Sequence, residues 1–255
     1  MIVDELRKDV VIEYLKTGRR IDGRALDEYR PIVVEKNVIS SAEGSARVRI
    51  GKTLVLVGVK VDAVIPFKDR PDEGVLSVSA ELLPMASPTF EPGPPNEDAI
   101  ELARIVDRGI RSAEAVDLKS LFIEEEKVWG VYVDIFVLDH DGNLIDAAGL
   151  ATVAALDELK IPKYVDGTVV REPSMILKLK EKPLYFTYSK IGDKILTDAS
   201  YVEELATDAR LTISVTDKHV VAMQKGGSGA FTRDEVISLI ENSFKKREKL
   251  LTYLE

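Results

Sequence analysis

The stretch WGVYVDIFVLDHDGNLIDAAGLATVAALDEL, residues 129–159, places strand and helix signals next to each other in mid-chain. Residues 129–146 carry β-branched and aromatic side chains around the turn Asp141-Gly142-Asn143, which predicts two strands joined as a hairpin. Residues 147–159 are rich in alanine and leucine, and they predict a helix that ends before Pro162. Strands followed directly by a helix indicate a chain that mixes both kinds of element.

The residues before this stretch predict the same alternation of helices and strands. Helical spacing over 2–15 precedes a β-branched pattern over 45–64, which a Gly-Lys turn divides into a hairpin. Five prolines between 84 and 95 predict an irregular loop, and a helix is expected over about 97–116.

The residues after the stretch predict a second group of strands and a final helix. Strands are expected around 167–179, 184–190, 193–197, 211–216 and 219–224. In the final helix, Thr232 and Glu235 form a capping box, and Phe231 and Val236 are placed to staple its start.

We therefore predict an α/β (α+β) fold with two sheet-plus-helix halves. No segment rich in glycine or serine separates the halves, so we expect residues 1–255 to form a single unit with approximate halves 24–163 and 167–254.

Composition limits the classes of function. The chain has 255 residues, of which 45% are hydrophobic, and this is enough to bury a sizeable core. A net charge of −9 argues against wrapping nucleic acid over the whole surface. The absence of cysteine excludes disulfides, thiolate catalysis and cysteine-ligated zinc, and it fits a reducing cytoplasm. The charged first residues and the lack of a long apolar stretch predict neither export nor a membrane role.

Two motifs offer weak evidence for phosphate chemistry. Asp139-His140-Asp141-Gly142 resembles the DxDG motif of haloacid-dehalogenase-type phosphatases, but we favour a hairpin turn because the strand pattern continues through Leu144 and Ile145. Lys225-Gly226-Gly227-Ser228-Gly229 is more typical of a flexible strand-to-helix connection than of a phosphate cradle. His140 and His219 lack a carboxylate grouping, so we predict no metal site and no cofactor.

The predicted helix over 97–116 carries a stronger signal. Arg104, Arg108 and Arg111 follow an i, i+4, i+7 spacing, which places them within about a 60° arc of one helix face. Arg104 and Arg111 have acidic neighbours at helical spacing, whereas Arg108 has none. This arginine stripe is either a solvated ladder of ion pairs or a row of guanidinium groups that binds successive phosphates.

Several motifs in fixed order resemble the ribonuclease PH family of phosphorolytic exoribonucleases. The likeness continues through the arginine helix and residues 138–156 to the capped final helix. Its amino-terminal part consists of Arg20-Ile21-Asp22-Gly23-Arg24, Glu28-Tyr29-Arg30-Pro31-Ile32, Gly44-Ser45-Ala46 and Gly51-Lys52-Thr53. The resemblance implies two related halves and a six-membered ring around an RNA channel. It leaves the role of Arg20 and Arg24 open between structure, interface and RNA contact.

The sequence departs from active members of that family at three places. The resemblance implies a Gly-Thr/Ser-Arg turn that opens the second helix and binds phosphate, and we match this turn to Gly149-Leu150-Ala151, which lacks the hydroxyl and the guanidinium. It also implies two acidic residues six positions apart, and we match these to Gly192 and Asp198. A pair of arginines expected before the arginine helix is replaced by Pro94-Pro95-Asn96.

These departures resemble the non-catalytic ribonuclease PH-like subunits of the archaeal exosome. We therefore expect no catalytic residue, RNA contact through Arg104, Arg108 and Arg111, and a cytoplasmic hetero-oligomer. The implied partners are a catalytic paralogue that alternates with this chain in a hexameric ring, RNA-binding cap subunits and single-stranded RNA. An active phosphorolytic ribonuclease, a DxDG-type phosphatase and a purely structural ring member remain as alternatives.

Overall fold

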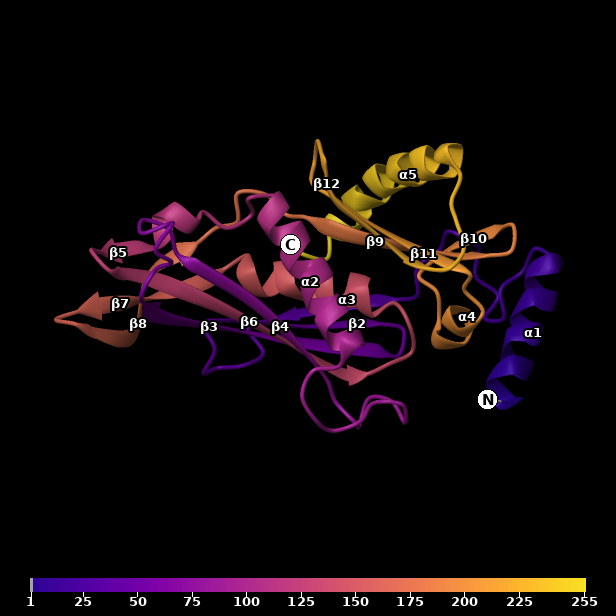
Figure 1. The fold of residues 1–255 in the computed structure, drawn as a ribbon, viewed down its shortest axis with the longest axis horizontal. Coiled ribbons are helices and arrows are strands. Elements are labelled where there is room, and N and C mark those ends of the chain that lie inside the picture. The colour runs from indigo at the N-terminus through magenta and orange to yellow at the C-terminus, as the bar shows by residue number, and fades with distance from the viewer. Residues whose placement is uncertain (1) are drawn as a thin grey trace.

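Two β-sheets enclose a pair of helices in the computed structural model, which describes residues 2–255 and the side chains of residues 7–255 (Figure 1). The first sheet has the order β1-β2-β3-β6-β4, with β5 paired to the end of β6. Neighbouring strands are antiparallel except for β4, which runs parallel to β6. Its strands are β1 (Ile32–Lys36), β2 (Gly44–Ile50), β3 (Thr53–Val64), β4 (Val75–Leu82), β5 (Phe122–Glu124) and β6 (Lys127–Asp139).

The second sheet is antiparallel and has the order β10-β9-β11-β12. Its outer face is covered by α5, and α4 follows β10 (Figure 1). The elements are β9 (Leu184–Ile191), β10 (Lys194–Thr197), α4 (Tyr201–Leu205), β11 (Ala209–Val215), β12 (Val220–Gly227) and α5 (Arg233–Leu251).

Helices α2 (Glu97–Ser112) and α3 (Leu144–Leu156) lie between the two sheets. Helix α3 packs against β2 and β3 on one side and β9 on the other. Because protein surrounds it, α3 is buried around its whole circumference, and most of its residues are apolar. One hydrophobic cluster therefore joins both halves, with members such as Val57, Ile135, Leu150, Phe186 and Ile213.

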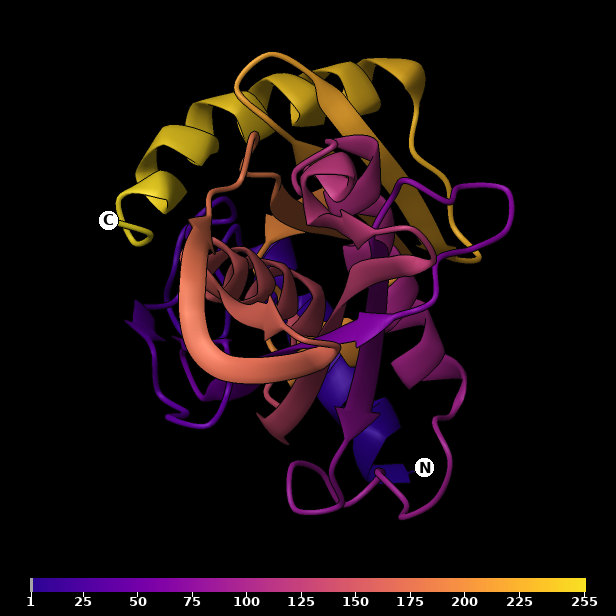
Figure 2. The same cartoon turned by 90° about the vertical axis from the view of Figure 1, so that its left-hand side faces the viewer.

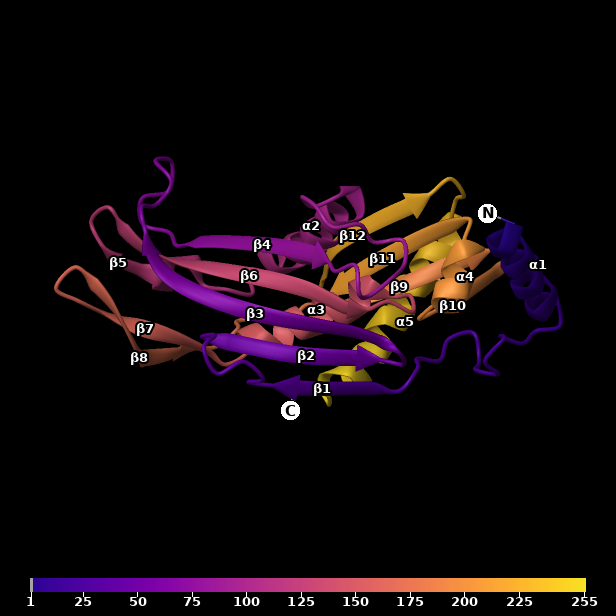
Figure 3. The ribbon, with the colours of Figure 1, turned by 90° about the horizontal axis from the view of Figure 1, so that it is seen from below.

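Two smaller parts lie at opposite ends of the molecule. A hairpin of β7 (Leu159–Val165) and β8 (Thr168–Leu177) projects at one end, and Figure 2 shows it toward the viewer. At the other end, α1 (Ile2–Lys16) packs against α4, as the view from below shows (Figure 3). The short 3-10 helix η1 (Leu118–Leu121) connects α2 to β5. Among the described helices, none combines the length and apolar character needed to cross a lipid bilayer.

The predicted mixed class is confirmed, and so are the first helix, the β2–β3 hairpin, the proline-rich loop and the strands after residue 167. The final helix begins at the predicted capping box, with Thr232 and Glu235 bonded reciprocally. Helix α2 ends at Ser112, earlier than predicted. Strands β1, β4, β5 and β7 and helix α4 were not predicted from the sequence.

The predicted hairpin within residues 129–146 is wrong. Strand β6 lies between β3 and β4, so neither of its edges is free for another strand. The chain therefore turns at Gly142 and Asn143, both with positive φ, and continues directly into α3. Pro162 does not terminate a helix but lies inside β7, where the register with β8 is irregular.

Candidate functional site

The arginine stripe lies on the solvent-facing side of α2. Arg104, Arg108 and Arg111 are exposed, whereas Leu102 and Val106 on the other side of the helix are buried. Asn96 caps the helix, because its side chain accepts a hydrogen bond from the backbone N–H of Ala99 at 3.0 Å.

Two of the three arginines have no carboxylate partner within the described part of the chain. Arg111 pairs with Asp107 at 2.8 Å. Glu101, a potential partner of Arg104 by spacing, instead pairs with Arg210 of β11 at 2.8 Å.

The remaining contacts of the stripe are few. Arg108 donates one hydrogen bond to the neutral Oε1 of Gln224 at 3.0 Å, and no described residue hydrogen-bonds or ion-pairs with the side chain of Arg104. The stripe is therefore not a ladder of ion pairs: two exposed guanidinium groups are free to meet an external anion.

The turn that opens α3 is not where the sequence analysis placed it. Gly149-Leu150-Ala151 lies in the middle of the helix and is fully buried, so the assignment of these residues to a phosphate turn is wrong. The helix begins after Asn143, and its first residues are Leu144 and Ile145. Neither Leu144 nor Ile145 offers a hydroxyl or a guanidinium.

Gly149 has a packing role instead. A Cβ atom at this position would lie 2.2 Å from Cδ2 of Tyr185, and one at Gly109 of α2 would lie 2.2 Å from the Tyr185 hydroxyl. The ring of Tyr185 thus fills the space between the two helices, and its hydroxyl donates to the carbonyl of Val106 at 2.6 Å.

A carboxylate of the chain itself occupies the amino-terminal end of α3. Glu204 of α4 accepts a hydrogen bond from the backbone N–H of Asn143, with 2.7 Å between Oε1 and N. Free N–H groups and the helix dipole make such an end a favourable place for an anion. Burial raises the pKa of Glu204 to about 7, against the opposing effects of the Asn143 N–H, Arg210 and Arg30.

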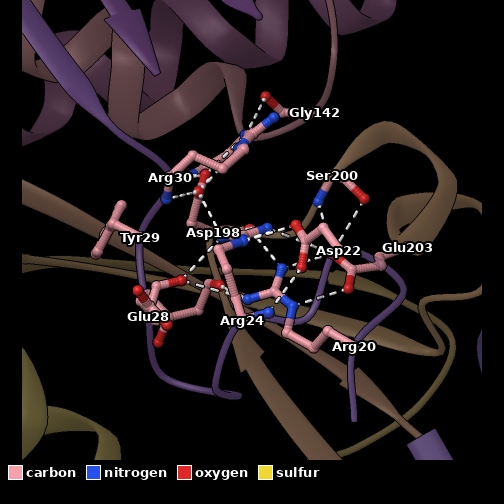
Figure 4. Close-up of polar contacts among 12 residues, drawn as sticks. Arg20, Asp22, Arg24, Glu28, Tyr29, Arg30, Gly142, Asp198, Ser200 and Glu203 are labelled. Carbon is pink, nitrogen blue, oxygen red and sulfur yellow. Dashed lines mark hydrogen bonds and ion pairs between the residues drawn. The ribbon is translucent and has the colours of Figure 1, made fainter. Parts of the chain in front are cut away.

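Asp198 is buried within a set of hydrogen-bond donors (Figure 4). Its Oδ1 accepts from Arg30 Nη2 at 2.7 Å and from Asn143 Nδ2 at 2.8 Å. Its Oδ2 accepts from Arg24 Nη1 at 2.9 Å and from the backbone N and Nε of Arg30 at 2.8 and 2.9 Å. Burial acts to raise the pKa of Asp198, but the bonds and charge of Arg30 outweigh it and hold this pKa below its usual value.

The two positions matched to the acidic pair, Gly192 and Asp198, have different surroundings. Gly192 lies in the turn between β9 and β10, with a φ of 58° and its amide bonded to Asp208. Six positions after Asp198 stands Glu204, and both carboxylates accept hydrogen bonds from Asn143. The match of Gly192 and Asp198 to the acidic pair of active family members stays a prediction.

Arg20 and Arg24 face inward to the same cluster (Figure 4). Arg20 is 1% exposed and grips Glu203 with two nitrogens, Nε lying 2.8 Å from Oε1. It also donates to the carbonyls of Thr197 and Asp198 at 2.9 and 2.8 Å. These arginines join the segment before β1 to the segment between β10 and α4, which assigns them a structural role.

The DxDG-like motif at Asp139 to Gly142 and the glycine-rich motif at Lys225 to Gly229 both belong to the framework of the fold. The Asp141 carbonyl and carboxylate both accept from Arg30, and Asp139 ends β6. Lys225 to Gly227 belong to β12, and the rest of that motif connects β12 to α5. Within the described residues, no group of three or more histidine, aspartate or glutamate side chains is arranged to hold a metal ion.

The family models and the relatives that match this chain all point to one family. Residues 28–162 match the model of the 3′ exoribonuclease family, domain 1, and residues 183–246 match that of domain 2. The exosome complex component Rrp42 of Thermococcus gammatolerans is 48% identical, over 98% of this chain and 94% of the relative. Its counterpart in Methanothermobacter thermautotrophicus is 46% identical, over 100% of this chain and 96% of the relative.

Solved structures match equally well. A chain in the structure described as the Archaeoglobus fulgidus exosome with RNA bound to the active site superposes with a TM-score of 0.91, at 45% identity and over the full length of both chains. A chain of an archaeal exosome core superposes with a TM-score of 0.89 at 42% identity, over 100% of this chain and 98% of the other.

Proposed function

This chain belongs to the 3′ exoribonuclease family, with its ribonuclease PH-like fold, and from that premise we propose that it is a non-catalytic, RNA-contacting subunit of an exosome. The full-length similarity to Rrp42 exosome components supports the choice of complex. The observation that carries the non-catalytic role is the position of the Glu204 carboxylate at the start of α3.

Glu204 disfavours phosphate at the place where the family resemblance puts it. An attacking phosphate would need the N–H groups at the start of α3, a hydroxyl and a guanidinium. The N–H of Asn143 is already bonded to Glu204, and Leu144 and Ile145 supply neither of the other groups. A phosphate dianion would also be repelled by an ionised Glu204 at close range.

Asp198 is unsuited to acid or metal-assisted catalysis. Its two oxygens accept five hydrogen bonds from Arg24, Arg30 and Asn143, which leaves no position for a metal ion or a reacting proton. We therefore assign the Asp198 carboxylate to the fold and expect it to perform no chemistry.

The arginine stripe supplies the RNA contact. Arg104 and Arg108 are exposed, lack carboxylate partners among the described residues, and lie one helical turn apart on α2. Guanidinium groups in this arrangement can grip phosphates along a single strand. That one similar chain comes from an exosome solved with RNA supports this assignment.

The proposed complex is a hexameric ring in which this chain alternates with a catalytic paralogue, with RNA-binding cap subunits on one face. In it, the chain helps to structure the active site of the paralogue and to hold RNA for 3′-to-5′ phosphorolysis. A cytoplasmic location fits the absence of cysteine.

Phosphorolysis by the purified chain tests the proposal. With single-stranded RNA and inorganic phosphate, we expect no release of nucleoside diphosphates from this chain alone. The complex assembled with the catalytic paralogue is expected to release them. Phosphate-dependent release by the chain alone would identify it as an active enzyme, and Mg²⁺-dependent hydrolysis of a simple phosphate ester would favour a phosphatase.

Assembly is tested by light scattering after size-exclusion chromatography. Co-expression with the paralogue is expected to give a stable hetero-oligomer with the mass of a hexamer. A chain that stays monomeric in the presence of the paralogue would contradict the proposed ring.

A further inference from the structure

Strands β11 and β12 of the second sheet each place a side chain against α2, the helix that carries the arginine stripe. Arg210 of β11 donates a hydrogen bond from Nη2 to Oε1 of Glu101 at 2.8 Å. Gln224 of β12 accepts a hydrogen bond from Nη1 of Arg108 at 3.0 Å. The second half of the chain therefore contacts this helix at two points that lie about two helical turns apart.

Glu101 would neutralise Arg104 if its carboxylate were free. The two residues are three positions apart on α2, a spacing at which oppositely charged side chains reach each other. Among the residues that the structure describes, however, the Glu101 carboxylate bonds only to Arg210, and the side chain of Arg104 has no partner. Arg210 and Arg104 therefore compete for one carboxylate, and Arg210 holds it.

Arg210 competes for Glu101 from the more enclosed position. Its side chain is 29% exposed, whereas Arg104 belongs to the exposed face of α2. Water and salt screen an exposed ion pair more than a partly buried one, so Glu101 is held more firmly by Arg210 than it would be by Arg104. Strand β11 also lies between β9 and β12, so the sheet fixes the point from which Arg210 reaches α2.

A glycine in the neighbouring strand leaves room for this arginine. Gly226 of β12 lies directly opposite Arg210 in the strand register. A Cβ atom at position 226 would lie 3.2 Å from Nη2 and 3.5 Å from Nε of Arg210. The guanidinium thus lies across Gly226, and the absence of a side chain there leaves it space to reach Glu101.

We propose that Arg210 is a positioning residue for RNA: by holding Glu101, it keeps the guanidinium of Arg104 free to bind a phosphate. Arg210 itself needs no contact with RNA in this role. Without Arg210, Glu101 would pair with Arg104 and would place an uncompensated negative charge beside the bound strand. The inference rests on the proposed RNA contact of the arginine stripe, and it adds a residue from the other half of the chain to that contact.

RNA binding by the complex assembled with the paralogue tests this role. With a labelled single-stranded RNA at low salt, we expect Arg210→Gln to weaken binding about threefold, the effect of one unit charge roughly 6 Å from another in water. Adding Glu101→Gln to this variant should restore native affinity, because the released carboxylate is then gone. Lys190→Gln is the matched control with unchanged affinity, since Lys190 of the same sheet pairs at 2.8 Å with Glu235 of α5 instead of with α2.

The Arg104→Ala background separates a role through Arg104 from a general change of charge. In that background, Arg210→Gln is expected to weaken RNA binding less than it does in the native chain, because the arginine that Glu101 would neutralise is missing. Equal losses in the two backgrounds would show that Arg210 acts independently of Arg104 and would overturn the inference. A failure of Glu101→Gln to restore binding would overturn it as well, and would indicate direct contact of Arg210 with RNA.

A readout without RNA distinguishes this inference from the proposed function. In the NMR spectrum of the chain, the Nε–H signal of Arg104 should change little on Glu101→Gln in the native background and clearly in the Arg210→Gln background, where the two side chains pair. If stripe variants lose RNA affinity but this exchange of partners is not seen, the inference alone is overturned. If the exchange is seen but the double variant Arg104→Ala, Arg108→Ala binds RNA normally, the proposed RNA contact is overturned, and with it the role of Arg210 in RNA binding.

Discussion

The buried charges of Arg20, Arg24 and Arg30 explain why an acidic protein concentrates arginines before its first strand. Arg20 and Glu203 have side chains that are 0% and 2% exposed, and Arg20 donates two hydrogen bonds to Glu203. Removing one partner of such a pair leaves an uncompensated charge in the interior, which costs far more than the pair contributes when intact.

We predict that Arg20→Ala lowers the free energy of unfolding by about 3–5 kcal/mol. The physical reason is that Glu203 then stays buried without its guanidinium partner. Arg47→Ala is the matched control, because Arg47 grips Glu35 in the same two-bond geometry but with side chains 44% and 48% exposed. That change is expected to cost far less than Arg20→Ala, because solvent screens an exposed ion pair.

Denaturant unfolding of both variants at constant pH measures the difference. Equal losses in the two variants would show that burial of the Arg20–Glu203 pair carries no special weight. An Arg20→Ala variant as stable as the native chain would contradict the structural role assigned to this arginine.

At the scale of elements, Tyr185 connects three of them. It comes from β9 and fills a space left by the two glycines of α2 and α3, Gly109 and Gly149. Small residues at these two positions allow the helices to approach the second sheet, so the glycines determine the spacing of the layers.

We predict that Gly149→Ala destabilises the chain by about 1–3 kcal/mol, because the new methyl group must displace the Tyr185 ring in a close-packed core. Alanine would otherwise favour the helix by up to about 1 kcal/mol. Ser238→Ala, at an exposed position of α5, is the control and is expected to change stability by less than about 0.5 kcal/mol. A Gly149→Ala variant of native or raised stability would remove the packing role.

Local signals in the sequence predicted several elements correctly. The capping box at Thr232 and the Gly51-Lys52 turn act through bonds between residues close in sequence, so their outcome does not depend on the rest of the fold. The hairpin at Asp141–Asn143 failed because its outcome depends on β4, a strand that the sequence analysis missed and that occupies one edge of β6.

The candidate site was only partly predictable for the same reason. The exposure of the arginine stripe followed from helical spacing alone. The partners of the stripe could not be predicted from helical spacing. Glu101 pairs with Arg210, which lies 109 positions further along the chain. Likewise, the position of Glu204 at the start of α3 depends on how α4 packs, which no local pattern encodes.

At the scale of the molecule, a net charge of −9 makes most of the surface unfavourable for RNA. Binding is then confined to the few places where cations are not neutralised by neighbouring carboxylates. The arginine stripe is such a place, because Glu101 and Asp107 are engaged by Arg210 and Arg111.

We therefore predict that the double variant Arg104→Ala, Arg108→Ala weakens RNA binding by the assembled complex for all sequences alike, since phosphate contacts position a strand without reading its bases. Each lost contact should flatten the plot of log K against log[salt] by roughly 0.7 for a single strand. Arg111→Ala is expected to change the slope less, because Asp107 already neutralises this arginine. Stability should change little, as Arg108 loses only its bond to Gln224.

Fluorescence anisotropy with a labelled RNA at several salt concentrations measures the slope, and Arg47→Ala provides a control far from α2 in sequence. An unaltered slope in the double variant, with the ring intact, would show that the stripe does not bind RNA.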